Sequence, residues 1–144
     1  MKTTWILHCH HDVLLEPLQG TLKERISYIK KEKPAHEQKT RLRLIKVLTE
    51  DEVELIPKKA WEAWYKVKEA QEVYSKAWKA WKSYDKAHEE YDKAQEMCDK
   101  AQEMYDKAQE VFNKVLLSPD FLDWHKKICV PGCPWDGSSI FPIV

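Results

Sequence analysis

The sequence predicts a mainly α-helical protein in which a long heptad-repeat helix joins a small α-helical head, with some β-structure, formed by both ends of the chain. Residues 58–117 contain no Gly and no Pro, and their second half is a tandem seven-residue repeat, whereas all the Pro and most of the His and Cys lie outside this stretch. We therefore divide the 144-residue chain into an N-terminal part of the head (1–57), a helical region (58–117) and a C-terminal part of the head (118–144).

The repeat has the pattern of an amphipathic helix. Its units begin at Tyr84 and read YDKAHEE, YDKAQEM, CDKAQEM and YDKAQEV, followed by a partial FNKV. The apolar first, fourth and seventh positions fall within an arc of about 120° on a helix. Ala lies at the centre of that arc, where a small side chain lets another helix approach closely. Glu precedes Lys by four residues in each unit, an order that stabilises a helix by roughly 0.2–0.5 kcal/mol per pair.

A strict seven-residue spacing predicts a partner helix. One arrangement is a single helix about 90 Å long that self-associates as a coiled coil. The other is an antiparallel helical hairpin within one chain. Because no Gly or Pro marks a turn, the sequence favours the unbroken helix and a homo-oligomer.

Charge along the helical region favours antiparallel pairing in either arrangement. In residues 58–82 seven Lys outnumber three Glu by four, and in residues 83–115 nine acidic residues outnumber five Lys by four. An antiparallel partner would lay the basic half against the acidic half. Trp61, Trp64, Trp78 and Trp81 take the large positions of the basic half.

The segments outside the repeat predict short elements. Thr21 with Glu24 forms a capping box for a helix that Pro34 ends. Ser118-Pro119-Asp120 predicts the start of another short helix. The remaining predicted elements are a strand at residues 3–9, a helix within 36–49, an acidic connector at 50–57, and a short strand at 139–143 that pairs with 4–8.

The pattern His-x3-Cys-x3-Cys in the C-terminal segment indicates a zinc site. His125 and Cys129 are four residues apart on a helix, and the turn expected at Pro131-Gly132 would return Cys133. Thiolates with imidazole suit zinc in a tetrahedral site. His8 or His10 would supply the fourth ligand. Reduced core cysteines with surface histidines, or a Cys129–Cys133 disulfide, are the alternatives.

Two other functions are compatible with the sequence. The N-terminal cluster of His8, His10, His11 and Asp12, together with Asp136, could form the metal site of a hydrolase. The Trp-rich half of the helical region could bind a host protein or ligand, or stack on single-stranded nucleic acid, although an aromatic stripe at helical spacing is more typical of a core. The sequence has no P-loop, GxGxxG or GxSxG motif, so a non-enzymatic role is favoured.

Composition and charge indicate where in the cell the protein functions. The net charge is zero, which gives no general reason for binding nucleic acid or a membrane. No apolar run approaches 18 residues, and the N-terminal segment does not read as a signal peptide. We expect a cytoplasmic protein with reduced cysteines.

The chain resembles uncharacterised phage and metagenomic proteins that carry tandem YDKA-type heptads. The residues that carry the resemblance are His10-His11-Asp12, the repeats from Tyr84 to Val111, and the CPWDG tail at 133–137 with Phe141. The resemblance implies a phage context, hence a host-cell cytoplasm, and no particular activity. The sequence as a whole favours a self-associating structural or interaction protein whose head is stabilised by zinc.

Overall fold

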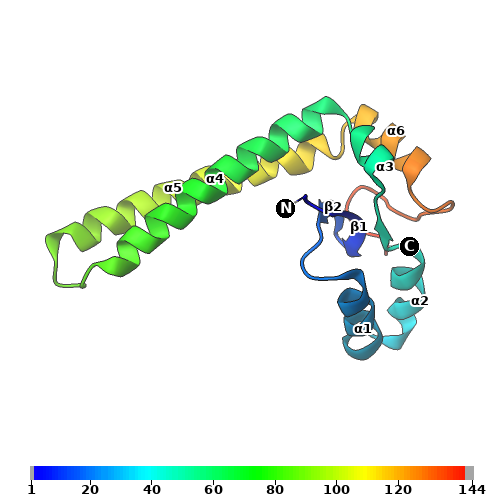
Figure 1. The fold of residues 1–144 in the computed structure, drawn as a ribbon, viewed down its shortest axis with the longest axis horizontal. Coiled ribbons are helices and arrows are strands. Elements are labelled where there is room, and N and C mark those ends of the chain that lie inside the picture. The colour runs from blue at the N-terminus through cyan, green and yellow to red at the C-terminus, as the bar shows by residue number, and fades with distance from the viewer. Residues whose placement is uncertain (1, 142–144) are drawn as a thin grey trace. The chain divides into compact units, whose positions relative to one another are not determined.

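The computed structural model describes residues 2–141, and in that range it has six helices and one three-stranded antiparallel sheet (Figure 1). The mainly helical class is confirmed. The chain divides into two compact units. One, which we call the terminal unit, combines the two chain ends, Met1–Ile56 and Pro119–Val144. The other, Pro57–Ser118, is the helical hairpin.

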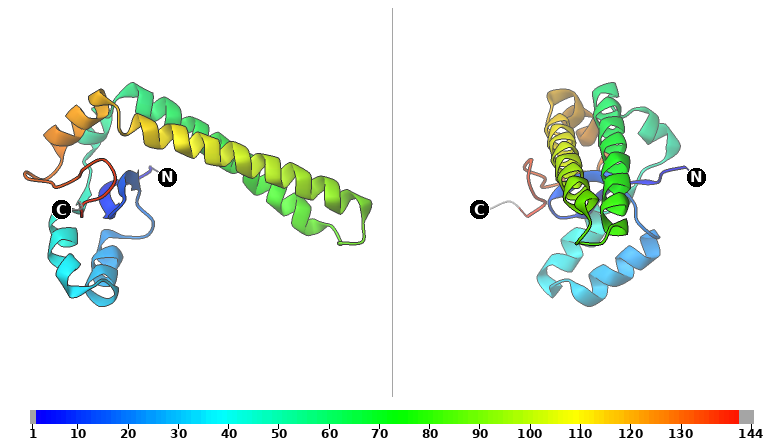
Figure 2. Two further views of the ribbon diagram at one scale, coloured as in Figure 1. Left: turned by 180° about the vertical axis from the view of Figure 1, so that it is seen from behind. Right: turned by 90° about the vertical axis from the view of Figure 1, so that its left-hand side faces the viewer.

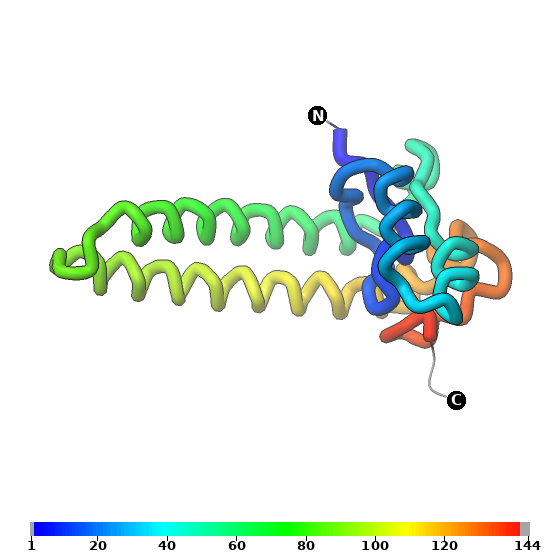
Figure 3. Tube along the Cα trace, turned by 90° about the horizontal axis from the view of Figure 1, so that it is seen from below, coloured from blue at the N-terminus to red at the C-terminus, as the bar shows by residue number. Residues whose placement is uncertain are grey.

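The helical hairpin consists of two long antiparallel helices. Helix α4 spans Lys58–Ser83 and α5 spans Glu89–Val115, and they run side by side in each view (Figures 2 and 3). The prediction of one unbroken helix over residues 58–117 is therefore wrong, and the alternative of a hairpin is observed. The apolar stripe of the repeat finds its partner helix within the same chain.

Small side chains line the seam between the two helices, as the repeat predicted. Aromatic rings extend the contact along the hairpin in three pairs, with ring centroids 5.4 Å apart for Trp64–Phe112, 6.4 Å for Tyr74–Tyr105 and 5.8 Å for Trp81–Tyr91. The buried residues are Ala60, Ala63, Val67 and Ala70 of α4, and Ala94, Cys98, Ala101 and Phe112 of α5.

Polar side chains, and not Gly or Pro, make the turn of the hairpin. The Ser83 hydroxyl donates to the Ala80 carbonyl (2.6 Å), and the Asp85 carboxylate accepts from the Ala87 amide (3.1 Å). His88 Nδ1 accepts from the Glu90 amide (3.2 Å) and so caps α5. Each of these side chains offers the backbone a partner that competes with the helix. His88, which stands where the later repeat units have Gln, is thus the N-cap of α5.

The sheet of the terminal unit places strand β1 (Trp5–His10) between β2 (Val13–Pro17) and β3 (Lys46–Val47). The predicted strand at 3–9 corresponds to β1. Strand β2 was missed because the two-residue loop before it, His11-Asp12, lacks the Asn-Gly or Gly signal of a tight hairpin. The β1–β2 register shifts between Leu7, paired with Leu15, and His10, paired with Val13, which leaves a bulge in β1.

Four short helices complete the terminal unit. The capping box of Thr21 and Glu24 is confirmed at the start of α1. A second capping box, Thr49 with Glu52, starts a helix in the segment predicted to be a connector. The helices are α1 (Leu22–Glu32), α2 (Ala35–Leu44), α3 (Glu50–Glu54) and α6 (Pro119–Ile128).

The sequence predicts a strand at 139–143, whereas the described part of this tail contacts the loop between β1 and β2 through a backbone hydrogen bond. Residues 139–141 form no strand, and the rest of that prediction lies outside the described residues. The Ile140 amide donates to the His11 carbonyl (2.9 Å), and Ile140 is buried. This contact holds the tail close to the β1–β2 hairpin.

Long-range polar contacts tie α6 to the N-terminal part of the unit. The Lys46 ammonium bonds both the Ile128 carbonyl (2.6 Å) and the Glu52 carboxylate (2.7 Å). The Trp124 indole N–H donates to the Glu52 carbonyl (3.3 Å). With Phe121 and Trp124 buried, these bonds hold α6 beside the segment from β3 to α3.

Candidate metal centre

Four side chains from three parts of the terminal unit meet at one point. They are His8 in the bulge of β1, His125 on α6, Cys129 just after α6, and Cys133 in the following turn. One donor atom from each lies within 4.8 Å of the other three. His8, His125 and Cys129 are buried, and Cys133 is partly exposed. The sequence therefore assembles two imidazoles and two thiols from residues 125 positions apart.

The C-terminal three residues of this group follow from local structure. His125 and Cys129 share a face because helical hydrogen bonding continues to the Cys129 amide, which donates to the His125 carbonyl (2.8 Å). Residues 130–133 then form a turn closed by the Cys133 amide and the Val130 carbonyl (3.2 Å). Pro131 and Gly132 occupy its centre, and Gly132 has φ +75°, the conformation that a type II turn requires at this position.

His8 enters the site from an unusual backbone conformation. Its φ is 51°, and it is the one residue other than Gly with positive φ among residues 2–141. A left-handed conformation of this kind costs about 1–3 kcal/mol and is found most often at functional sites. The bulge that contains His8 interrupts the regular alternation of β1. That interruption lets the imidazole reach α6 from the central strand.

The nitrogen and sulfur atoms are close enough to share one ligand. The Nε2 atoms of His8 and His125 are 3.1 Å apart. The Cys133 sulfur lies 3.3 Å from His8 Nε2 and 3.9 Å from His125 Nε2. His8 Nδ1 is buried and has no hydrogen-bond partner among the described residues. The indole of Trp135, 5.6 Å from the His8 ring between centroids, covers part of the site.

Burial keeps both imidazoles neutral at physiological pH. It lowers the pKa of His8 to about 4, with repulsion from His125 as a second cause, and it also lowers the pKa of His125. Neutral imidazole is the form that binds metals. Burial, followed by the neighbouring Cys133, raises the pKa of the Cys129 thiol to about 12. A bound cation would have to displace that proton, since the thiolate is the metal ligand.

The structure brings together four of the five predicted metal ligands. His8, His125, Cys129 and Cys133 form one group that could hold a metal ion, and all four cysteines are free. His10, the alternative to His8, does not join them, because its side chain is exposed and its Nδ1 bonds the Glu16 carboxylate. A pocket of about 380 Å³, lined partly by His125, Cys129 and Cys133, gives access to the group from the surface.

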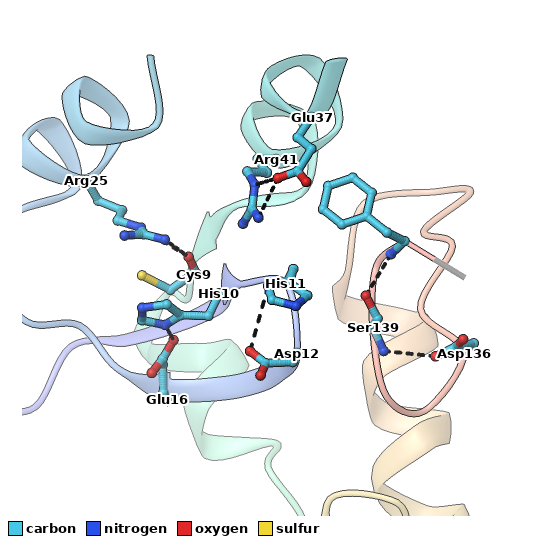
Figure 4. A network of polar contacts seen from close by, with 11 residues as sticks. Cys9, His10, His11, Asp12, Glu16, Arg25, Glu37, Arg41, Asp136 and Ser139 are labelled. Atoms are coloured by element: carbon cyan, nitrogen blue, oxygen red, sulfur yellow. Dashed lines mark hydrogen bonds and ion pairs between the residues drawn. The ribbon is translucent and has the colours of Figure 1, made fainter. Parts of the chain in front are cut away.

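The residues predicted for a hydrolytic centre do not converge in the described part of the chain. His8 lies in the buried group, whereas His11 is 4.0 Å from the Asp12 carboxylate on the surface. The Asp136 carboxylate accepts from the amides of Ser138 and Ser139 (2.8 and 2.9 Å), which also lower its pKa (Figure 4). Asp136 therefore caps its own loop.

The Trp side chains of the hairpin mainly pack against other aromatic rings. Trp64 and Trp81 face aromatic rings of α5, and Trp61 lies 6.3 Å from Tyr65 between ring centroids. Trp78 is 44 % exposed, with the Lys82 ammonium 5.7 Å from its ring. Binding of a host protein or ligand at this surface stays a prediction. Cys98 is buried in the seam, in the place of a Tyr of the repeat.

Comparison with known proteins adds no identification. No family model, curated protein or solved structure matches this chain, so the phage context implied by the repeat and tail stays a prediction. Among the described residues, none of the helices combines the length and the apolar character needed to cross a membrane.

Proposed function

We propose that His8, His125, Cys129 and Cys133 bind one zinc ion. A tetrahedral site with Zn–N of about 2.0–2.1 Å and Zn–S of about 2.3 Å places two nitrogens roughly 3.3–3.4 Å apart and a nitrogen and a sulfur about 3.6 Å apart. The observation that carries the proposal is the agreement with this geometry: 3.1 Å between the nitrogens, and 3.3 and 3.9 Å from the Cys133 sulfur to them. Two thiolates and two neutral imidazoles also balance the ion's charge.

The proposed role of the zinc ion is structural. Four protein ligands fill a tetrahedral zinc ion and leave no position for water or substrate, which is typical of structural sites. The ion would fasten the central strand of the sheet to the C-terminal segment, closing a loop between His8 and His125, which are 117 positions apart. A small unit with a limited core gains much of its stability from such a cross-link.

Metal content measured by native mass spectrometry tests this site. We expect the purified protein to retain one zinc ion in the presence of a weak chelator, and Cys133→Ser to lose it. Cys98→Ala is the matched control, because Cys98 is buried in the seam of the helical hairpin and is not one of the four ligands, and it should retain the zinc. A wild-type protein that holds no metal after purification and fails to bind added Zn²⁺ would contradict the proposal.

We further propose that the hairpin is an interaction element whose partner is a second copy of the chain. Met97, Met104 and Val111 are 66 %, 58 % and 50 % exposed, and each occupies the seventh position of its repeat unit. Seven residues turn a helix by about 700°, so successive members are displaced by only about 20° and form a row along α5. Heptad-spaced apolar rows are the surfaces that partner helices cover.

A second copy suits this row better than an unrelated surface. Two-fold symmetry places the row of one copy against the identical row of the other copy, so the same exposed row forms both sides of the interface. In an antiparallel pair the basic α4 of one hairpin can also lie against the acidic α5 of the other. Unbranched Met side chains adapt to such a contact. The proposed function is therefore a self-associating structural protein with a zinc-stabilised terminal unit.

The mass of the protein at micromolar concentration tests self-association. We expect a dimer by sedimentation equilibrium, and a monomer when Met97 and Met104 are both changed to Glu. The control, Gln95→Glu with Gln102→Glu, adds the same two charges at exposed positions of the same helix and should leave the dimer intact. A monomeric wild-type protein would show that the hairpin needs no partner beyond its own two helices.

A further inference from the structure

A second group of metal-binding side chains lies at the β1–β2 hairpin. It consists of Cys9, His10 and Glu16, and one donor atom from each lies within 4.8 Å of the other two. Figure 4 shows the Cys9 sulfur beside the His10 ring, with the Glu16 carboxylate on the other side of that ring. None of these residues belongs to the four-residue group described above.

The fold creates this group through the same bulge that places His8. Regular β1–β2 pairing is interrupted between Leu7 and His10. Glu16 of β2 pairs with Ile6 along the backbone, and its carboxylate reaches the His10 ring. The Arg25 guanidinium fixes the backbone there, because its Nε and Nη2 both donate to the Cys9 carbonyl (3.1 and 2.6 Å). His8 and Cys9, the two consecutive residues of the bulge, thus belong to two separate groups of donors.

We propose that Cys9, His10 and Glu16 bind a second Zn²⁺ ion that keeps one coordination position open. A thiolate, a neutral imidazole and a carboxylate are all zinc ligands, and their two negative charges balance the ion. Soft thiolate together with hard carboxylate favours zinc over cations that prefer oxygen alone. Three protein ligands leave the fourth tetrahedral position to water, the arrangement of zinc sites that exchange ligands or activate water.

The exposure of the ligands supports an open site. The side chains of His10 and Glu16 are 49 % and 24 % exposed, whereas Cys9 is buried. Solvent therefore reaches the group from the His10 side, where the open position would lie. The His10 nitrogen and the Glu16 oxygen are at hydrogen-bond distance and would separate to roughly 3.3 Å around a zinc ion. Two partly exposed side chains can make that small movement without disturbing the sheet.

The competing interpretation is a surface ion pair beside an unrelated buried thiol. His10 and Glu16 would then bind each other and no metal, and their replacement would leave the zinc content unchanged. The two interpretations differ in stoichiometry, which can be measured without any assumption about activity.

Titration of the metal-free full-length protein with Zn²⁺, followed by native mass spectrometry, separates them. We expect saturation at two zinc ions per chain for wild type and at one for Glu16→Gln and for His10→Ala. His11→Ala is the matched control, since it removes a neighbouring exposed imidazole outside the group, and it should still bind two. Wild-type saturation at one ion, or two ions retained by both Glu16→Gln and His10→Ala, would overturn the proposal.

Substitution in the other group shows which proposal a negative result affects. Cys133→Ser should retain the ion that is sensitive to Glu16→Gln and lose the one that is not. If Cys133→Ser loses its fold, wild type and Cys9→Ser are compared instead, with Co²⁺ in place of Zn²⁺. The thiolate-to-cobalt absorption band should be weaker in Cys9→Ser than in wild type, and circular dichroism should show that Cys9→Ser is folded. An unchanged band would overturn the second site and leave the four-residue site standing.

Discussion

The helical hairpin and the terminal unit depend on opposite kinds of contact. In the hairpin the same kind of contact recurs along the seam between two helices joined by one turn, with aromatic pairs at three levels. In the terminal unit a few contacts join residues far apart, such as His8 with His125 and Lys46 with Ile128. Loss of one contact should therefore be limited in the hairpin and severe in the terminal unit.

Removal of the metal should have the largest effect and should separate the two regions. Structural zinc contributes on the order of 10 kcal/mol in small zinc domains, which is comparable with the whole stability of a domain. We expect a chelator, or Cys133→Ser, to lower amide-exchange protection in the terminal unit while α4 and α5 remain protected. Hydrogen exchange measured by mass spectrometry on the full chain would detect this. Equal loss of protection in both units would contradict the expectation that only the terminal unit depends on the metal.

A change in the hairpin seam should give the reverse pattern. Phe112 is buried against Trp64, and truncation of a buried Phe to Ala costs about 3–5 kcal/mol because it leaves a cavity. We expect Phe112→Ala to lower exchange protection in α4 and α5 by that amount and to leave zinc content unchanged. Gln102→Ala, at an exposed position of the same helix, is the control. Zinc loss in Phe112→Ala would show that the two regions are energetically coupled.

An ion pair in the terminal unit gives a smaller, pH-dependent effect. Arg41 is buried and bonds the Glu37 carboxylate through Nε and Nη2 (2.9 and 2.7 Å). The hydrogen bond from Arg41 lowers the pKa of Glu37 below its usual 4.5. The stabilisation is therefore fully present above pH 4.5 and is lost as the pH falls through the lower, folded-state pKa. The hairpin should lose less per pair, because its Glu–Lys pairs on α5 are exposed and stabilise the helix by only roughly 0.2–0.5 kcal/mol each.

Comparison of wild type with Glu37→Gln isolates the contribution of the pair. We expect the variant to be about 1–3 kcal/mol less stable at pH 7, because a buried guanidinium loses its charged partner. The difference should shrink below pH 4.5. Thermal denaturation at a series of pH values measures it, and protonation of metal ligands affects both proteins alike. A difference that stays constant down to pH 3 would mean that Glu37 acts through packing.

Local signals in the sequence predicted much of this fold. The capping box at Thr21 and Glu24 and the helix start at Ser118-Pro119-Asp120 are properties of a few neighbouring residues, and both are found. Helix α3 carried the same kind of signal in Thr49 and Glu52, and it was overlooked within an acidic segment. The hairpin turn was missed because capping by Asp85 and His88 replaces the usual Gly or Pro.

The sequence predicted those metal ligands that lie close together in the chain. His125, Cys129 and Cys133 follow from a helix and a turn, whereas the choice between His8 and His10 depended on the bulge in β1. Simple alternation along a strand treats those two residues as equivalent, and the left-handed conformation of His8 distinguishes them. Glu16 was not considered as a ligand because strand β2, which brings it back beside His10, was not recognised.

The turn before Cys133 offers the smallest test of how the terminal unit holds its ligands. Gly132 has φ +75°, and a side chain there would meet no atom within 4 Å, so the need for Gly is conformational. A left-handed conformation costs Ala about 1–2 kcal/mol, whereas Asn tolerates it better. We expect Gly132→Ala to lose zinc to a chelator several-fold faster than wild type, and Gly132→Asn to lie between them. Because Asn is the larger side chain, the opposite order would indicate that space and not backbone conformation limits this turn. Zinc loss that is faster in Gly132→Ala than in Gly132→Asn would instead show that the metal group depends on the left-handed backbone conformation of Gly132. The turn of the hairpin, which contains no Gly, has no such dependence.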